Sequence, residues 1–264
     1  MPPPSSREPG SAKDPQFAYT LAKGLDVLRA FEGTAPSMGN AELASRTGLT
    51  RPTVSRLTRT LTLLGYLQYN KAEARYRLAA STLALGYPLL SRLSLRQLAR
   101  GPMQALADQA RGAVSIAMRS GLKMFIVESC VDQSAANGRP DIGAARPIAS
   151  TSLGHAYYSA APSDEKLELA LALRREAGLD WPALEALLAR SQAQFDQHGH
   201  CVRAKAPDPI VAVSVPIRAP GGGETLVMNC AVASFNLEGD ALTEQIAPRL
   251  MHLVHQLERS MGLP

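Results

Sequence analysis

The sequence predicts an α+β chain made of two parts that a helix joins. Up to residue 65, leucines and other apolar residues recur at helical spacing around a glycine turn. After residue 100, short apolar runs typical of strands alternate with long helical stretches. The charge divides in the same place, because residues 1–100 hold 14 Lys and Arg against 6 Asp and Glu, and residues 101–264 hold 14 against 17. Such an asymmetry favours one part that faces nucleic acid and one that does not.

The overall composition excludes several classes of protein. The 264 residues suffice for two hydrophobic cores, and no apolar run approaches the roughly 20 residues that a membrane-spanning helix needs. The start, "MPPPSSREPGSAKDP", has no apolar stretch and is predicted to be a disordered tail over residues 1–16 rather than a secretory signal. Three widely spaced cysteines without a CxxC pair fit a reducing environment, so a cytoplasmic protein without contact to a membrane is expected.

The first elements are predicted to form a helix-turn-helix. Leu21, Leu25, Leu28 and Phe31 predict a helix that ends at Gly33. A short second helix follows, for which Asn40 can provide the N-cap, and Gly48 supplies a tight turn whose underside Leu49 can fill. Thr50 is the expected N-cap of a third helix, with Pro52 in its first turn, and the buried positions of that helix are Val54, Leu57, Leu61 and Leu64 before Gly65.

Polar residues outside this apolar stripe make the third helix a candidate for reading DNA. In a helix-turn-helix, the N-terminal half of this helix enters the major groove. Arginine there can bond guanine edges, while serine and threonine reach phosphates or thymine methyl groups. The expected contacts on this helix are Thr50, Arg51, Thr53, Ser55, Arg56 and Arg59. For any single one of these arginines, an ordinary solvated helix face explains the sequence equally well.

A basic hairpin is predicted after the third helix. Strands are expected at residues 66–69 and 75–78, joined by a polar turn, as in the wing of a winged helix. Lys71 and Arg75 are the expected phosphate contacts, and Arg77 adds to the positive charge. The ordered set of short helix, glycine turn, arginine-rich helix and basic hairpin predicts a domain over residues 17–80 that binds double-stranded DNA.

Several stretches resemble the IclR family of bacterial transcription regulators: "LAKGLDVLRAFEG", "ELASRTGLTRPTVSRLTRTL", "LGYLQYN" and "RYRLAASTLALGY". The resemblance implies a winged helix-turn-helix, a linker helix and a C-terminal GAF-like effector-binding domain. It also implies a homodimer or homotetramer that binds a near-palindromic operator. Within the family, "LAKGL", "LGYPLLSRLSLRQLA" and "TSLG" are most similar to regulators of aromatic-acid breakdown.

The linker helix is expected within residues 81–100. Leu83, Leu85, Leu89 and Leu93 would give it an exposed apolar edge. Because a lone helix of this character needs a partner, two copies of the chain are expected to pair there, which would set the spacing of two DNA half-sites.

The remaining part, residues 101–264, is predicted to be an α+β layer with helices on one side of a sheet. Helices are expected at residues 103–112, 163–178, 182–199 and 242–261. Strands are expected at residues 113–121 and 123–131, which meet at a Ser-Gly turn, and at residues 209–219 and 225–235.

No catalytic pattern was found in this part. Gly221 to Gly223 lack a following Lys-Ser/Thr and are expected to form a hairpin turn. There is no GxSxG or HExxH motif; His198 and His200 could hold a metal, but solvated loop histidines are commoner, so no metal or cofactor is expected. Cys201 and Cys230 are expected to be buried packing residues.

The segment "ASTSLGH" is the candidate effector site. Its small hydroxyl residues precede a helix that is expected to start near Leu153, and free N–H groups at such a start suit a carboxylate. The resemblance implies that this segment lines the effector pocket together with two pairs of strands. The expected effector contacts are Met118, Phe125, Ser150, Thr151, Ser152, Leu153, Arg203, Ser214 and Asn229. A role of Ser150 and Thr151 in capping the helix is an open alternative.

One departure from the family pattern concerns charge. Relatives carry an acidic stretch before the strand "PIVAVSVPI", whereas this chain has Arg203 and Lys205 ahead of Asp208. This difference favours an anionic effector, although both cations could instead face water. The preferred hypothesis is a DNA-binding regulator controlled by a small, aromatic carboxylate. The alternatives are an enzyme with a basic accessory domain and an architectural DNA-binding protein that needs no pocket.

Overall fold

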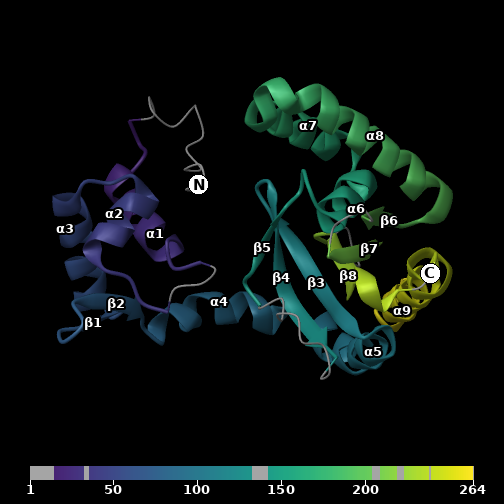
Figure 1. Cartoon of the computed structure of the whole chain (residues 1–264), viewed down its shortest axis with the longest axis horizontal. Helices are drawn as coiled ribbons and strands as arrows, with labels where there is room; N and C mark the ends of the chain where they lie inside the picture. The colour runs from purple at the N-terminus through teal and green to yellow at the C-terminus, as the bar shows by residue number, and fades with distance from the viewer. Residues whose placement is uncertain are drawn as a thin grey trace. The chain divides into compact units, whose positions relative to one another are not determined.

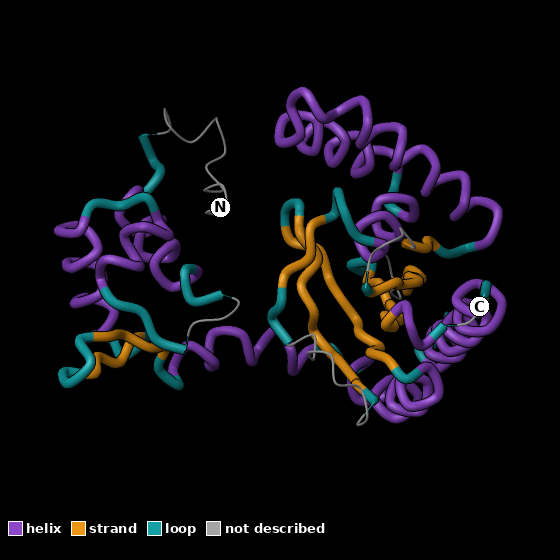
Figure 2. The backbone as a smooth tube through the Cα atoms, viewed as in Figure 1, coloured by secondary structure: helices purple, strands orange, loops and turns teal. Residues whose placement is uncertain are grey.

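The computed structural model describes residues 15–32, 36–132, 142–203, 209–218, 223–237 and 239–263. The predicted tail as far as residue 14, and Gly33, Lys205, Asp208 and Gly221, lie outside these residues. The chain divides into two compact units at the boundary between Arg92 and Leu93, and each unit is described by itself. The mixture of helices and antiparallel strands confirms the predicted α+β class (Figures 1 and 2).

The first unit is a helix-turn-helix followed by a two-stranded hairpin (Figure 1). Gly48 ends the second helix with a φ of 66°, a backbone conformation that favours glycine. Thr50 stands at the N-cap of the third helix, and Pro52 lies in its first turn, where a missing N–H is tolerated. These elements are α1 (Tyr19–Arg29), α2 (Asn40–Thr47), α3 (Arg51–Leu63), β1 (Leu67–Asn70), β2 (Arg75–Leu78) and, after them, α4 (Ser81–Arg92).

A small core holds the three helices and the hairpin together. Its buried members are Val27, Phe31, Met38, Leu43, Val54 and Leu67. Leu57 and Leu61 pack against this core, as the sequence predicts. Leu64, however, lies just after the end of α3 and is 63% exposed, whereas Thr58 in the middle of α3 is buried, at 0%.

The helix that the spacing of Leu21, Leu25 and Leu28 predicts is present as α1, although Leu21 and Leu25 are exposed and the helix buries Val27. One further expectation for this unit is wrong. Asn40 is the first residue of α2, not its cap. Gly39 occupies the cap, and its N–H donates to the Glu42 carboxylate at 3.1 Å, an interaction that a glycine cap permits.

The expected linker is divided between two helices. α4 contains no buried residue, and α5 (Leu95–Ala110) begins after a break at Leu93 and Ser94. α5 therefore starts earlier than the predicted residue 103. It continues through Pro102, which is tolerated inside the helix although proline normally favours a boundary. Within the described residues, no helix is both long and apolar enough to span a membrane.

The second unit is built on one antiparallel sheet of six strands in the order β5-β4-β3-β8-β7-β6 (Figure 2). The strands are β3 (Gly112–Ser120), β4 (Lys123–Val131), β5 (Ala145–Pro147), β6 (Cys201–Arg203), β7 (Ile210–Ile217) and β8 (Leu226–Ala233). The helices after α5 are α6 (Ser152–Ala160), α7 (Ser163–Ala177), α8 (Trp181–His198) and α9 (Ala247–Ser260); shorter turns are η2 (Gly178–Asp180), η4 (Ser234–Asn236) and the π-helical η5 (Leu242–Ile246).

Helices cover both faces of this sheet, which corrects the one-sided layer that the sequence predicts. Figure 1 shows α5 and α9 together on one side and α6, α7 and α8 on the other. The side-chain contacts agree, because Glu128 of β4 bonds Arg96 of α5, whereas Ser214 of β7 bonds Ser152 of α6. Strand side chains alternate between faces, so these contacts define an α5 face and an α6 face for every strand.

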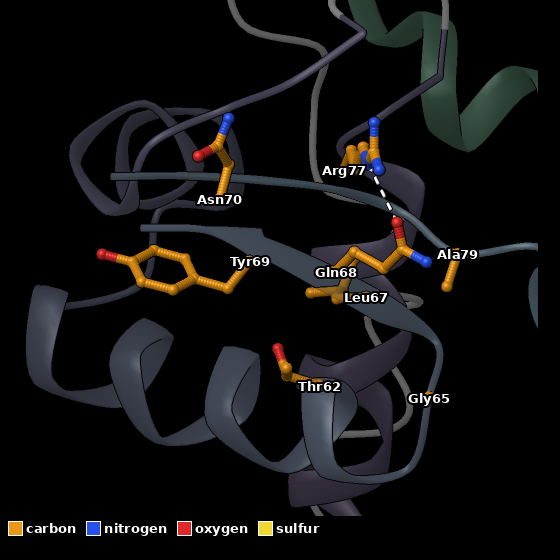
Figure 3. Close-up of a pocket in the computed structure, with 8 residues that line it drawn as sticks. All are labelled: Thr62, Gly65, Leu67, Gln68, Tyr69, Asn70, Arg77 and Ala79. Carbon is orange, nitrogen blue, oxygen red and sulfur yellow. Dashed lines mark hydrogen bonds between the residues drawn. The ribbon is translucent and has the colours of Figure 1, made fainter. Parts of the chain in front are cut away.

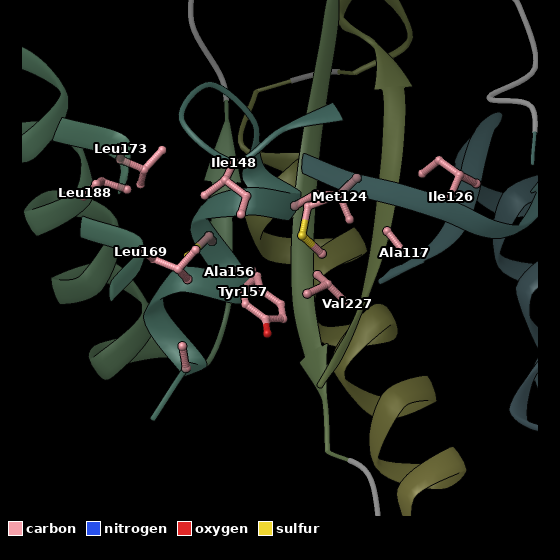
Figure 4. Packing of buried hydrophobic residues seen from close by; sticks show 13 residues of the cluster. Ala117, Met124, Ile126, Ile148, Ala156, Tyr157, Leu169, Leu173, Leu188 and Val227 are labelled. Carbon is pink, nitrogen blue, oxygen red and sulfur yellow. The ribbon is translucent and has the colours of Figure 1, made fainter. Parts of the chain in front are cut away.

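The α6 face carries the larger described core (Figure 4). Met124 and Ile126 from β4 meet Leu153 and Tyr157 from α6, and leucines of α7 and α8 complete the layer. Arg119 donates to the Tyr157 hydroxyl at 3.1 Å, and that hydroxyl donates to Glu165 at 2.6 Å. This chain of bonds ties β3, α6 and α7 together.

Two short edge strands, β5 and β6, were not predicted. Each contains three residues, too few for an alternating pattern to appear in the sequence. β6 is important for the site described next, because it places Arg203 beside the start of α6.

Candidate nucleic-acid interface and effector site

The N-terminal half of α3 presents an open polar surface. Arg51, Arg56 and Arg59 are exposed, and their guanidinium groups make no hydrogen bond or ion pair with any residue that the structure describes. Ser55 is exposed too, while the hydroxyl groups of Thr50 and Thr53 lie 2.9 Å apart. The six predicted contacts therefore run from the N-cap, Thr50, to Arg59 along α3, and three of them are cations available for a polyanion.

The hairpin presents Lys71 but engages Arg75 differently. Lys71 is exposed in the turn between the strands, where Ala74 adopts a φ of 51°. Arg75 is half-buried, and its guanidinium bonds Ser37 and Glu42 within the unit. Of the two predicted hairpin contacts, only Lys71 resembles the arginines of α3 in being open.

A hollow of about 530 Å³ lies between the C-terminal end of α3 and the hairpin (Figure 3). Its floor includes Leu67 and Tyr69, and a hydrogen bond of 2.9 Å from Arg77 to Gln68 lies along its edge (Figure 3). A second hollow, of about 430 Å³, lies between α5 and α9. None of the predicted DNA or effector contacts lines either one.

The start of α6 is held in place by its own turn. Thr151 caps the helix, because its hydroxyl accepts from the Gly154 N–H at 3.1 Å and donates to the Pro147 carbonyl at 2.7 Å. A side chain on Gly154 would lie 2.2 Å from Cα of Ile148, so only glycine lets the helix approach this turn. The capping role of Thr151, which the sequence left open as an alternative, is therefore present in the structure.

Four polar residues form a row across the sheet beneath α6. Ser115 pairs with both Ser129 and Asn229, and Asn229 pairs with Ser214, so the four side chains share one face of neighbouring strands. The hydroxyl of Ser214 donates to that of Ser152 at 2.9 Å, which joins this polar row to the first residue of α6. The predicted effector residues Ser152, Ser214 and Asn229 are therefore brought together.

Asn229 is the unusual member of the polar row. Its side chain is 8% exposed, and its amide forms no hydrogen bond with the part of the chain that the structure describes. No fully buried side-chain nitrogen or oxygen there lacks a partner, so the amide of Asn229 is still accessible from outside. Ser115 and Ser129, by contrast, bond one another at 3.1 Å. An accessible amide on the same sheet face as the start of α6 can bond a ligand that enters there.

A positive charge and a buried histidine border the same place. Arg203 of β6 donates to the Ser150 carbonyl, immediately before α6. His155 is buried and bonded to Ala149 and Ser191. Burial lowers the pKa of His155, and the nearby charge of Arg203 lowers it further, so this histidine is neutral at pH 7. The predicted grouping of Thr151, Ser152 and Arg203 is present.

Met118 and Phe125 do not belong to this group. Met118 follows Ala117 on β3 and pairs with Phe125 on β4 and Leu226 on β8. Ala117 belongs to the core on the α6 face, so its neighbour Met118 points to the other face. Alternation then places both side chains on the α5 face, opposite to the polar row. The expectation that Met118 and Phe125 line one pocket with Ser214 and Asn229 is wrong. Leu153 is buried in the core on the α6 face.

Cys201 and Cys230 are both buried, as the sequence predicts. Burial raises the pKa of the Cys201 thiol to about 11 and that of Cys230 to about 12, so both remain protonated at pH 7. In the described ranges, no three His, Cys, Asp or Glu side chains gather as a metal site. What the geometry offers is a cationic helix end in one unit and a buried polar row in the other.

The helix-turn-helix with its open arginines and basic hairpin defines the class of DNA-binding transcriptional regulators. The model of the IclR helix-turn-helix domain matches residues 20–71, and that of the bacterial transcriptional regulator IclR C-terminal domain matches residues 88–222. The chain belongs to the IclR family of transcriptional regulators, and the families and relatives that it matches are regulators rather than enzymes. The resemblance that the sequence showed is confirmed.

Three relatives illustrate the match. The crystal structure of an IclR family transcriptional regulator from Brucella abortus is 36% identical, with a TM-score of 0.78 over 96% of both chains. The HTH-type transcriptional regulator TsaQ1/TsaQ2 of Comamonas testosteroni is 29% identical over 93% of this chain and 89% of its own. The Pca regulon regulatory protein of Pseudomonas putida is 26% identical over 96% of this chain and 89% of its own.

Proposed function

We propose that this regulator binds a near-palindromic operator as a homodimer or tetramer in the cytoplasm, and that a small aromatic carboxylate controls the binding. The row of polar side chains beneath the start of α6 carries the ligand half of the proposal, because its Asn229 amide is accessible and makes no bond within the described chain, so it can bond a ligand. The open arginines of α3 support the DNA half.

The charge around the polar row favours an anion. Arg203 lies at the start of α6, and no acidic side chain belongs to the row or to the Thr151–Ser152 turn. Hydroxyl and amide groups can bond a carboxylate, while the apolar residues of the α6 face can receive a ring. The narrower class rests on likeness: one relative regulates the Pca regulon, and another, 24% identical, is a p-hydroxybenzoate hydroxylase transcriptional activator of Acinetobacter baylyi.

The ligand half can be tested by isothermal titration calorimetry. Benzoate, hydroxybenzoates and short keto acids would be titrated into the parent and into Asn229→Leu, which keeps the volume but removes the amide. Binding to the parent, weakened about tenfold or more in the variant, is expected from the loss of a hydrogen bond to a charged group. Met118→Leu, on the opposite sheet face, is the matched control and should bind like the parent. Heat from none of the acids would contradict the carboxylate assignment.

The DNA half can be tested on α3 and on the hairpin separately. Arg51→Ala or Arg56→Ala should cost about 1–3 kcal/mol of operator binding and relax sequence preference, as expected for a base contact. Lys71→Ala should weaken binding to all sequences alike and reduce the salt slope by roughly one unit, as expected for a phosphate contact. Parent-like binding by all three variants would show that α3 and the hairpin do not contact DNA.

A further inference from the structure

Three segments that are distant in the sequence meet beside the hairpin. The backbones of Met38 and Tyr76 exchange two hydrogen bonds of 2.8 Å, which adds one bridging residue to the two-stranded sheet. Next to this bridge, Arg75 donates from Nε to the Ser37 hydroxyl at 3.0 Å and from Nη2 to the Ser37 carbonyl at 2.8 Å. The same Nη2 donates to the Glu42 carboxylate at 2.7 Å.

Glu42 has a second role at the start of α2. Its Oε2 atom, which pairs with Arg75, also accepts the Gly39 N–H at 3.1 Å. The hydrogen bond from Gly39 lowers the pKa of Glu42, with a smaller contribution from Arg75, so the carboxylate is charged at pH 7. One oxygen therefore links the hairpin to the first helix of the helix-turn-helix.

This geometry differs from that of a phosphate contact. Of the five N–H groups that a guanidinium carries, three of those on Arg75 point into its own unit. A carboxylate at 2.7 Å also cancels much of the charge that would attract a phosphate. Lys71, in the exposed turn of the same hairpin, has no such partner among the described residues.

We infer that Arg75 and Glu42 are positioning residues that fix the hairpin against α2, and thereby against α3, rather than contacts to DNA. The inference rests on the DNA-binding function proposed above. α2 and α3 share the core with Met38 and Leu67, so a hairpin fixed to α2 keeps a constant place relative to the arginines of α3. Without the pair, the hairpin samples further orientations, and the fraction of molecules ready to bind falls.

Removing the negative charge of Glu42 should have opposite effects on DNA affinity under a positioning role and under a simple repulsion of DNA. Glu42→Gln removes a negative charge but retains an oxygen that can accept the Gly39 N–H, so α2 remains capped. Glu73→Gln removes the same charge from the exposed hairpin turn, where Glu73 has no partner in the described chain. If Glu42 only repelled DNA, both variants would bind DNA more tightly. A positioning role predicts that Glu42→Gln binds about fivefold more weakly, as for one lost hydrogen bond, while Glu73→Gln binds equally or more tightly.

Arginine and lysine variants provide a second, independent readout. Lysine can neutralise a phosphate but cannot span Ser37 and Glu42 as the guanidinium does. Arg75→Lys is therefore expected to bind as weakly as Arg75→Gln, and both should keep the parent's salt slope. Lys71→Gln, the matched control, should lower that slope by about one unit. The double variant Glu42→Gln with Arg75→Gln should bind no more weakly than either single one.

The measurement is fluorescence anisotropy at several salt concentrations with two probes: the DNA upstream of the protein's own coding region and a random-sequence duplex. Thermal unfolding monitored by circular dichroism identifies any variant that is not folded. Glu42→Gln retains the helix cap, so its DNA affinity can be interpreted even if an arginine variant fails to fold. Tighter binding by Glu42→Gln, or a lower salt slope with rescue by lysine at position 75, would overturn the inference. Failure of the parent to bind either probe would instead count against the proposed function itself.

Discussion

The guanidinium of Arg96 lies 3.0 Å from the carboxylate of Glu128, and only 5% of that glutamate side chain is exposed. Arg96 stands in the first turn of α5, just after the break that follows α4. Glu128 precedes Ser129 on β4, and its other oxygen accepts the Ser129 N–H at 3.1 Å. Because Ser129 faces α6, this ion pair connects the start of α5 to the strand that carries one end of the polar row.

Breaking this pair is predicted to destabilise the second unit and to weaken the response to the effector. Arg96→Met leaves a buried carboxylate without its partner, which costs about 3 kcal/mol. In denaturant titrations the variant should unfold earlier, and the ratio of operator affinities with and without effector should move toward one. Arg100→Met, an exposed arginine on the same helix, is the control and should stay within about 0.5 kcal/mol of the parent. An unchanged affinity ratio in folded Arg96→Met would exclude a role in coupling.

Gly154→Ala is predicted to be among the most disruptive single changes in the second unit. The new Cβ would lie 2.3 Å from the Ile148 carbonyl oxygen, so α6 or its turn must move, and a loss of about 3 kcal/mol or more is expected. Gly24→Ala in α1 is the matched helical control, since its Cβ would meet only Leu57, at 4.0 Å. That change should be neutral or stabilising by up to about 1 kcal/mol. Equal thermal shifts for the two variants would contradict the close packing at Gly154.

The apolar surface of α4 is predicted to be the contact between two copies of the chain. Leu83 is 72% exposed and Leu89 is 49% exposed, and α4 buries no residue within its own unit. Leu83→Glu combined with Leu89→Glu should shift the sedimentation equilibrium toward monomer and weaken operator binding. Leu179→Glu, at a fully exposed leucine of the second unit, should leave the association unchanged. A parent that sediments as a monomer would refute this role for α4.

Stability at acid pH is predicted to depend on Glu258. Burial alone would raise the pKa of Glu258, but hydrogen bonds from the side chain and backbone of Arg218 outweigh it and lower that pKa below 4.5. A lowered pKa in the folded state contributes stability above the unfolded pKa, and this contribution is lost as pH falls through the folded value.

Glu258→Gln should therefore reduce the free energy of unfolding by about 1 kcal/mol at pH 7, and the difference should shrink as the pH falls below the unfolded pKa and vanish once it is below the lowered pKa of the folded state. Glu244→Gln, on an exposed glutamate without a side-chain partner among the described residues, is the control. A difference between Glu258→Gln and the parent that stays the same from pH 7 down to the acid-unfolding range would contradict this assignment.

The helix-turn-helix could be predicted from sequence because its signals are local. Gly48, Thr50 and Pro52 each prescribe a backbone conformation within a few residues. The partners of Arg75 could not be predicted, since Ser37 and Glu42 are 38 and 33 residues away, and only the fold brings them together. The pattern indicates a basic hairpin but not which of its cations remain open.

The sheet shows the same division between local and distant information. Strands β3 and β4 were predicted because they are mostly apolar on both faces, which fits a sheet that helices cover on both sides. That same property removes the alternation from which faces are assigned, so Met118 and Phe125 were placed on the wrong side. Asn229 and Ser214 were placed with Ser152 correctly.

The most direct test of a ligand-controlled DNA-binding regulator is footprinting on the DNA that flanks its own coding region, at two salt concentrations, with and without hydroxybenzoates. The account predicts a protected near-palindrome, steep salt dependence and a change in protection when the effector is present. A folded protein that protects neither this DNA nor random genomic DNA, with every candidate acid added, would contradict it.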